Sequence, residues 1–358
     1  MSKPHMLIEQ WSPVCDIQAF VEKNEQNYYF YLWINPGSDN SMIKSCWICN
    51  AVPAPKEIDT SCMEMGIAPS MPVEYVSHDI DGIQLDGKKL RIVWFEEGDA
   101  AALFYEEEII CVIPGWSGYK GFHGYSKYAK GMGPFAWELT EALDTLAERV
   151  ENSREFWDYF ATDYWENFQQ AHLDSLENFF GPHQKYYAID GGKFPPKALV
   201  SGKKDGVCYG ITSGVSLIPM PCVEQYFEED AGKFRRMELG FATIEKHEPL
   251  CKMMFSVLSG ISSMPWKEIT FLAHGHTLPF KNIKGFDAIL FLNPKLVSGM
   301  EGPEYNSFMG DDVNLLWVVL LTKEEYQFVM EHDVTELLKK AKTDVKKLHV
   351  FDGETKFE

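Results

Sequence analysis

Two consecutive segments with a helical repeat of apolar residues divide this chain. In residues 137–159 and 164–180, apolar side chains recur every three or four positions, as they do along one face of an α-helix. Gly181-Pro182 follows the second segment and is a natural helix stop. We therefore expect a β-rich N-terminal domain at residues 1–160 that ends in a helix, a second domain at residues 161–350, and a C-terminal tail at residues 351–358.

The N-terminal third is typical of β-strands. Aromatic and β-branched residues dominate 28–34, the turn-forming cluster 35–40 follows, and 43–52 then predicts the second strand of a hairpin. Further strands are predicted at 90–95, 101–105 and 109–113. Residues 114–133 are rich in Gly, Tyr and Lys, so we expect a loop there.

The second half mixes strands and helices. Strands are predicted at 185–189, 207–218, 234–244, 269–272, 288–292 and 315–321, and helices at 250–261 and 335–342. Thr322-Lys-Glu-Glu325 has the spacing of a capping box and predicts a helix that runs to residue 332. Long Gly, Pro or Ser linkers are absent from the sequence. The expected fold class is α+β: two closely packed domains, each a mixed or antiparallel sheet with flanking helices.

Charge restricts the class of partner. The 358 residues carry a net charge of −20. This charge argues against nucleic acid, which needs a basic face, and disfavours an anionic membrane surface. It permits steered association with a basic protein. No apolar run is long enough for a membrane helix and no signal peptide is predicted, so we expect a cytoplasmic protein in which the eight cysteines are free thiols.

Cys46 and Cys49 form a CxxC spacing that is found in redox pairs and in zinc sites. Both fall in a predicted strand, where positions three apart point to opposite faces of a sheet. No second CxxC follows. We therefore expect ordinary buried or half-buried thiols.

The sequence His274-Gly275-His276 is the best candidate for chemistry. On a strand, positions two apart share a face, so two imidazoles could hold one metal ion, with Glu224, Glu228 or Asp287 as a third ligand. The alternatives are a structural role, in which a His pairs with buried backbone groups and the Gly allows a tight turn, and a contact with a partner.

Arg236 and Glu238 also share a face by strand alternation. We expect a cross-strand ion pair or a contact on the sheet surface, and a catalytic arginine–carboxylate pair is the alternative.

Two acidic runs are candidate contact surfaces. One spans residues 224–230 and includes Glu224. The other has six acidic residues between Glu96 and Glu108, ending in Glu106, Glu107 and Glu108, with no basic residue between them. Such runs are usually solvated faces, and the second is a candidate docking patch for a cationic partner.

The segment 115–125 combines four glycines with aromatic residues such as Trp116 and Tyr119. It lacks the spacing of a phosphate-binding loop and of a nucleophile elbow. Two interpretations stay open: a mobile loop that presents aromatic side chains to a partner, or a lid packed on the core.

Several segments of the second half together resemble the suppressor-of-fused (SUFU) family. They are Thr212-Ser-Gly-Val-Ser-Leu-Ile-Pro-Met-Pro221, the Arg-x-Glu-Leu pattern of 236–239, Gly275-His276-Thr277, and the hydrophobic strand 315–321 that leads into the Thr322 helix. The helix at 172–181 also resembles the opening helix of that domain. Leu321 stands where the family commonly has Pro, and Asp333 where it commonly has Gly. The similarity covers residues 164–338.

The resemblance implies an α+β domain that binds and masks another protein. Bacterial relatives resemble immunity or antitoxin proteins, and a protein of that type would neutralise a toxin such as a basic nuclease. The N-terminal third resembles no family that we can name. No segment supplies a convincing catalytic set, so we expect neither enzyme activity nor a cofactor. The alternatives are a metal-assisted hydrolase that uses His274 and His276, and a cytoplasmic regulatory scaffold without a toxin. Binding would use an exposed sheet edge or a cleft between domains.

Overall fold

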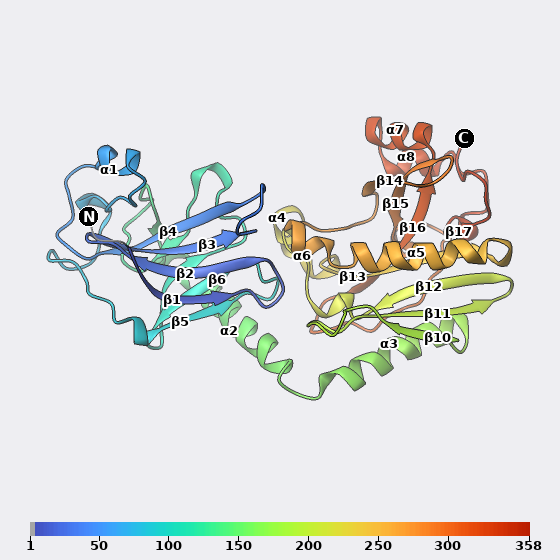
Figure 1. Ribbon diagram of the computed structural model, residues 1–358, viewed down its shortest axis with the longest axis horizontal. Coiled ribbons are helices and arrows are strands. Elements are labelled where there is room, and N and C mark those ends of the chain that lie inside the picture. The colour runs from blue at the N-terminus through green and yellow to red at the C-terminus, as the bar shows by residue number, and fades with distance from the viewer. Residues whose placement is uncertain (1–3) are drawn as a thin grey trace. The chain divides into compact units, whose positions relative to one another are not determined.

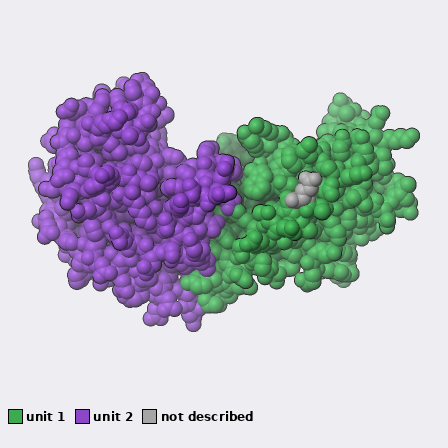
Figure 2. Space-filling model, turned by 180° about the vertical axis from the view of Figure 1, so that it is seen from behind, with its two compact units in different colours: residues 1–162 green, residues 163–358 purple. Residues whose placement is uncertain are grey.

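The computed structural model describes residues 4–358 and divides into two compact units, Met1–Thr162 (unit 1) and Asp163–Glu358 (unit 2) (Figures 1 and 2). Residues 1–3, which begin the expected N-terminal domain, lie outside the described residues. The division falls between α2 (Leu143–Tyr159) and α3 (Tyr164–Phe180), two residues after the expected end of the first domain. Each unit combines sheets and helices, which confirms the predicted α+β class.

Unit 1 contains two sheets. The first is antiparallel, with the strand order β1 (His5–Trp11), β2 (Ile17–Lys23), β3 (Asn27–Ile34), β4 (Met42–Asn50). The second has the order β5 (Leu90–Trp94), β6 (Ala101–Tyr105), β7 (Glu108–Ile113), β8 (Tyr125–Ser126), β9 (Trp137–Glu138), with only β8 and β9 parallel. Strand β4 packs against β7 and β8 of the second sheet, and consecutive residues at its C-terminal end are therefore buried on both faces.

Helix α2 covers part of the second sheet. Its side chains Leu146 and Val150 join Val93, Phe95 and Phe104 in one apolar cluster. The helix begins six residues later than the sequence predicts, because Trp137 and Glu138 pair as β9 instead. The short helix α1 (Thr60–Glu64) lies in the segment between β4 and β5, where its N-terminus is capped by the Asp59 side chain.

Unit 2 is built on one mixed sheet of eight strands. Seven follow the order β10 (Lys185–Ala188), β11 (Ala198–Lys204), β12 (Val207–Ser213), β13 (Arg236–Ile244), β16 (Val313–Leu321), β15 (Phe286–Leu292), β14 (Thr277–Ile283), and β17 (Val350–Phe351) pairs with β13. Only β13 pairs in parallel, with β16 and with β17. All nine residues of β16 are buried, which explains why its sequence is a continuous apolar run.

Helices cover both faces of this sheet (Figure 1). They are α3, α4 (Val223–Phe227), α5 (Glu248–Ile261), α6 (Met264–Glu268), α7 (Lys323–Glu331) and α8 (Val334–Leu338). Leu176 and Phe180 of α3 pack with Trp317 in the main core. Helix α5 packs on β12 and β13, where Phe255 lies so close to Gly210 that an added Cβ would be 2.0 Å from its ring.

Short 3-10 helices connect these elements. They are η1 (Val73–Tyr75), η2 (Gly87–Lys89), η3 (Tyr119–Gly121), η4 (Thr140–Ala142), η5 (Val215–Leu217), η6 (Glu228–Lys233), η7 (Glu245–His247), η8 (Pro294–Leu296) and η9 (Val345–Lys347).

The last eight residues are part of the fold of unit 2 and do not form the expected tail. Phe351 and Phe357 are buried. The predicted capping box of α7 is present: Glu325 Oε2 accepts from the Thr322 amide at 2.6 Å, and the Thr322 hydroxyl accepts from the Glu325 amide at 3.2 Å. Glu325 Oε1 also accepts from the Phe357 amide at 3.1 Å and from the Thr355 hydroxyl, so one carboxylate caps the helix and holds the chain end.

Some predicted elements are wrong. Residues 269–272 are irregular, the strand predicted at 207–218 ends at Ser213, and α8 ends at Leu338 rather than 342. Strands β1, β2, β11 and β14 were not predicted. Strand β14 contains Pro279, which is tolerated because β14 is an edge strand.

Candidate functional site

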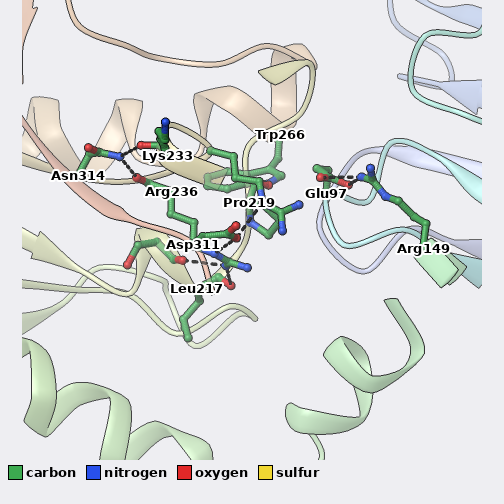
Figure 3. Close-up of polar contacts among 11 residues, drawn as sticks. Glu97, Arg149, Leu217, Pro219, Lys233, Arg236, Trp266, Asp311 and Asn314 are labelled. Carbon is green, nitrogen blue, oxygen red and sulfur yellow. Dashed lines mark hydrogen bonds and ion pairs between the residues drawn. The ribbon is translucent and has the colours of Figure 1, made fainter. Parts of the chain in front are cut away.

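Arg236 lies at the start of β13 with its side chain fully buried. Its Nε donates to Asp311 Oδ2 at 2.7 Å, and one terminal nitrogen donates to the carbonyl oxygens of Ser216 at 3.1 Å and Leu217 at 2.7 Å (Figure 3). Arg235 Nε donates to the same Asp311 oxygen at 2.8 Å. The guanidinium therefore ties β13 to two distant segments of the chain.

Glu238, two residues further along β13, is also fully buried. Its Oε2 accepts from the Thr212 hydroxyl at 2.6 Å. Its Oε1 accepts from the amides of Gly214 and Ser216 and from the Ser216 hydroxyl, at 2.9, 3.1 and 2.7 Å. Burial raises the pKa of Glu238, whereas these hydrogen bonds lower it.

These contacts explain the segment that begins at Thr212. Its side chains and amides hold the Glu238 carboxylate, and its carbonyls hold the Arg236 guanidinium. Gly214 has a φ of +99°, and an added Cβ would lie 2.4 Å from the Pro196 carbonyl oxygen, so only glycine fits. Trp266 Nε1 donates to the Pro219 carbonyl at 3.0 Å and fixes the end of the same segment.

The expected arrangement of Arg236 and Glu238 is wrong in one respect. They share a face of β13, but neither lies on the sheet surface, and each binds its own set of partners rather than the other. An unpaired buried charge is costly, and this is why each is surrounded by complementary groups. Their geometry is that of residues that hold the fold together.

His172 of α3 lies beside Glu238, with Nδ1 3.7 Å from Oε1. Burial lowers the pKa of His172 to about 3, so the imidazole is neutral at pH 7. Its ring contacts Phe168 and Tyr305, with centroids 4.1 and 4.9 Å apart. No sequence pattern indicates that α3 contributes a polar residue to this centre, because His172 occupies an ordinary core position of the helix.

His274 and His276 do not lie on a strand, which the two-imidazole metal site requires, and the tight turn of the structural alternative is present instead. They belong to the turn before β14, in which the His276 amide donates to the Ala273 carbonyl at 3.1 Å. His274 Nδ1 accepts from the Asn293 amide at 3.2 Å, and the His276 ring packs against Phe271. Burial lowers the pKa of both imidazoles. Gly275 has a φ of +86°, which favours glycine in this turn.

The three acidic residues considered as a further metal ligand lie on separate elements: Glu224 on α4, Glu228 at the start of η6, and Asp287 on β15. Within residues 4–358, no group of three or more His, Cys, Asp or Glu side chains is placed to hold a metal ion. Thr277 begins β14, and its hydroxyl lies 3.8 Å from Met330 Sδ.

The acidic run of unit 1 does not form one free surface. Asp99 is buried, and so is Glu97, which Arg149 contacts through both carboxylate oxygens at 3.0 Å. Burial raises the pKa of Asp99 to about 6. Glu106, Glu107 and Glu108, at the β6–β7 turn, pair with Lys89, Arg91 and Lys127. Basic residues from η2, from β5 and from the segment after β8 thus reduce the charge of the expected docking patch, and the acidic run itself does not reveal them.

The glycine-rich loop is anchored to unit 1. Lys44 Nζ donates to the Gly115 carbonyl at 2.7 Å, and the Gly118 amide donates to the Phe122 carbonyl at 2.7 Å. Trp116 is half-buried, whereas the side chain of Tyr119 is 66% exposed. The loop therefore combines both expectations: most of it packs on the unit, and its tip presents one aromatic ring.

The CxxC cysteines are buried in β4. Burial raises the pKa of Cys49, which disfavours the nucleophilic thiolate. All eight cysteines of the chain are free thiols.

Binding at an exposed sheet edge is one of the two expected modes, but the sequence does not indicate which strand forms that edge. Strand β10 is the terminal strand of the unit 2 sheet, and all four of its residues are exposed. Tyr186 and Tyr187 lie on it, and Phe194, which follows, is 42% exposed. The sequence predicts this strand, but only strand order shows that no other described strand pairs with its outer edge.

No helix within residues 4–358 has both the length and the apolar character needed to cross a bilayer.

Comparisons with known proteins give a family-model match, which lies within unit 2, and a similar solved structure. A chain of a solved structure described as "the Sufu-Fu complex crystal structure" shares 14% identity with this chain, with a TM-score of 0.37, and the similarity covers 53% of this chain and 91% of that one. No curated protein matches the sequence significantly. Residues 189–354 match the family model "Suppressor of fused protein (SUFU)". That region holds β13, its buried Arg236 and Glu238, and the segment that binds them, and it is this part of unit 2 that is similar to the SUFU family.

Proposed function

We propose that this chain is a non-enzymatic protein that binds and masks another protein, and that the SUFU-family unit takes up an extended partner segment along the outer edge of β10. The observation that carries the proposal is the exposure of all four residues of this terminal strand. Unpaired backbone groups on an edge strand are a ready template for a further strand. Neighbouring aromatic side chains add contact area of the type enriched in interfaces.

The backbone pattern of β10 defines which groups are available. The Ile189 amide donates to the Lys197 carbonyl, so this pair is hydrogen-bonded to β11. In an antiparallel ladder the bonded positions alternate, and Tyr187 therefore also faces β11, whereas Tyr186 and Ala188 present their backbone groups outward. A partner strand would bond to these two positions.

The partner that we propose is basic. The net charge of −20 favours association with a cationic protein through steering. A basic nuclease toxin is such a protein, and a chain that masks it in the cytoplasm would act as an immunity protein. A regulatory scaffold would use the same edge with a different partner.

The edge can be tested with one substitution. Ala188→Pro removes an outward amide without removing a bond to β11, whereas Ala188→Val keeps the amide and serves as the matched control. The partner is first identified by crosslinking and co-purification from the native host, and its affinity is then measured by calorimetry. We expect Ala188→Pro to weaken binding about tenfold, because a partner carbonyl loses its donor. Equal affinities of the two variants would contradict edge pairing.

Co-expression decides between the two kinds of partner. If the masked protein is a toxin, expression of this chain rescues cells that express the toxin, and Ala188→Pro reduces the rescue. A tight partner whose expression leaves growth unaffected would rule out the immunity role while leaving protein binding intact.

A further inference from the structure

A cavity of about 230 Å³ lies in unit 1, which the SUFU model does not cover. It is bounded by the β2–β3 hairpin and by the segment that follows α1. Two carboxylates and two phenol rings line it: Glu22 and Glu25 at the hairpin, and Tyr29 and Tyr31 on β3. In the ladder between β2 and β3, Glu22 lies opposite Tyr29, and Phe20 opposite Tyr31, so these side chains share one face of the sheet.

Asn27 holds one wall of the cavity in place. This residue is fully buried and lines the cavity. Its Nδ2 donates to the Ala68 carbonyl at 2.9 Å. Ala68 belongs to the segment that follows α1, so this hydrogen bond ties the start of β3 to the other wall of the cavity.

The charges around the cavity have one sign. Among the described residues that line it, none is Lys, Arg or His. Burial raises the pKa of Glu22. A carboxylate that is partly desolvated beside an aromatic wall is stabilised by a cation that can also donate hydrogen bonds.

The aromatic wall is held in place. Tyr31 stacks between Phe20 and Tyr29, with ring centroids 5.0 and 5.8 Å away. The Tyr29 hydroxyl donates to the Pro69 carbonyl at 2.7 Å. Ordered phenol rings attract organic cations and accept the apolar stem that carries them.

We propose that this cavity binds an alkyl-guanidinium or alkyl-ammonium group, with Glu22 as its counter-ion and the rings of Tyr29 and Tyr31 against its stem. A half-buried carboxylate, a wall of aromatic rings and the lack of basic side chains among the described lining residues all favour the same chemistry. The site is in a different unit from β10, and the inference does not rest on the proposed function.

A matched pair of probes tests the charge. Calorimetric titration of the full chain compares n-butylguanidinium chloride with neutral n-butylurea, which has a similar shape. We expect the cation to bind at least about ten times more tightly, as is typical of a charge-assisted hydrogen bond over a neutral one. Equal binding of the two, or no binding of the cation at millimolar concentration, would overturn the proposal.

Variants locate the site. Glu22→Gln should weaken binding of n-butylguanidinium about tenfold, whereas Glu57→Gln, which makes the same charge change at an exposed position outside the cavity, should leave it unchanged. Tyr31→Leu should weaken it several-fold and Tyr31→Phe, which keeps the ring, much less. Equal effects of Glu22→Gln and Glu57→Gln would show that the probe binds elsewhere and would contradict the assignment.

The same titration with the peptide acetyl-Gly-Arg-Gly-amide distinguishes the sources of the cation. Binding of n-butylguanidinium and peptide alike supports a pocket for any presented guanidinium. Binding of the peptide alone supports a site for a partner's arginine, and binding of the small cation alone supports a free amine or guanidine ligand. Failure of both probes would contradict the proposal, whatever the outcome for β10.

Discussion

Units 1 and 2 use acidic residues in different ways. Unit 1 has 25 acidic and 12 basic residues, a net charge of −13, and unit 2 has 28 and 21, a net charge of −7. In unit 2 the buried Glu238 and Asp311 are surrounded by donors from its own chain. In unit 1, Glu22 borders a cavity whose described lining residues include no Lys, Arg or His. This comparison shows that a conspicuous charged motif can serve the fold alone, and that a carboxylate without such a motif can line a cavity.

The largest expected effect tests the structural role of the buried arginine. Arg236→Met removes the donor to Asp311 and to the carbonyls of Ser216 and Leu217, and should lower the free energy of unfolding of unit 2 by about 3–5 kcal/mol. Urea unfolding, with hydrogen exchange of β13 to assign the transition, measures the loss. Arg154→Met, which breaks an exposed ion pair with Glu151, is the control and should cost less than about 1 kcal/mol. Similar losses for the two variants would remove the contrast between the units.

Two glycine substitutions test how tightly the segment that binds Arg236 and Glu238 is packed. Gly214→Ala places a Cβ 2.4 Å from the Pro196 carbonyl oxygen at a φ of +99°, whereas Gly285→Ala has a similar φ of +91° and open space around it. We expect a loss of about 1 kcal/mol for Gly285→Ala from the backbone conformation, and at least about 2 kcal/mol for Gly214→Ala. Thermal unfolding of both variants measures the difference. If Gly214→Ala were no more destabilising, the segment at Thr212 would not be tightly packed.

The smallest effect concerns acidification, which should act on the two units with opposite signs. The pKa of His172 is lowered from 6.5 to about 3, so between these values the unfolded chain binds a proton that the folded chain does not, and unit 2 loses stability as the pH falls. The pKa of Asp99 is raised from 3.8 to about 6, so unit 1 gains stability as the pH falls through that window.

Comparison of variants isolates the histidine. Between pH 5.5 and 4.5 the His172 contribution should fall by up to about 1.4 kcal/mol, and His172→Gln should abolish that part of the slope. His332→Gln, at an exposed position, is the control. Urea unfolding at the two pH values measures both slopes, and an unchanged slope in His172→Gln would refute the assignment.

Periodicity and local chemistry predict several elements closely. Helix α3 and the Thr322 capping box depend on contacts within a few residues, and both are present as predicted. Strands β3, β6, β7, β15 and β16 are apolar runs bounded by turns and were also recognised. Strands β1 and β11 were missed because their stability comes from pairing with neighbours: β1 is largely exposed, and β11 ends in two exposed lysines.

The candidate site was harder to predict than the fold. Alternation along β13 places Arg236 and Glu238 on one face, but burial and partners depend on Asp311 and Thr212, which are distant in the sequence. For His274 and His276, the strand required by the metal-site alternative is absent because Gly275 makes a turn, as the structural alternative expects. Lys89 of η2 and Lys127, which follows β8, pair with Glu106 and Glu108, and no local pattern could show these pairings.

By itself, the sequence determined the α+β class, the helices on either side of the division between the units, and the SUFU-type segments, because these follow from the spacing of residues along the chain. Only the tertiary structure decided which charges are neutralised within the chain, which sheet edge is left open, and where a cavity collects carboxylates and aromatic rings. Burial and electrostatic pairing depend on which distant segments meet in space, and the order of residues along a segment does not specify those neighbours.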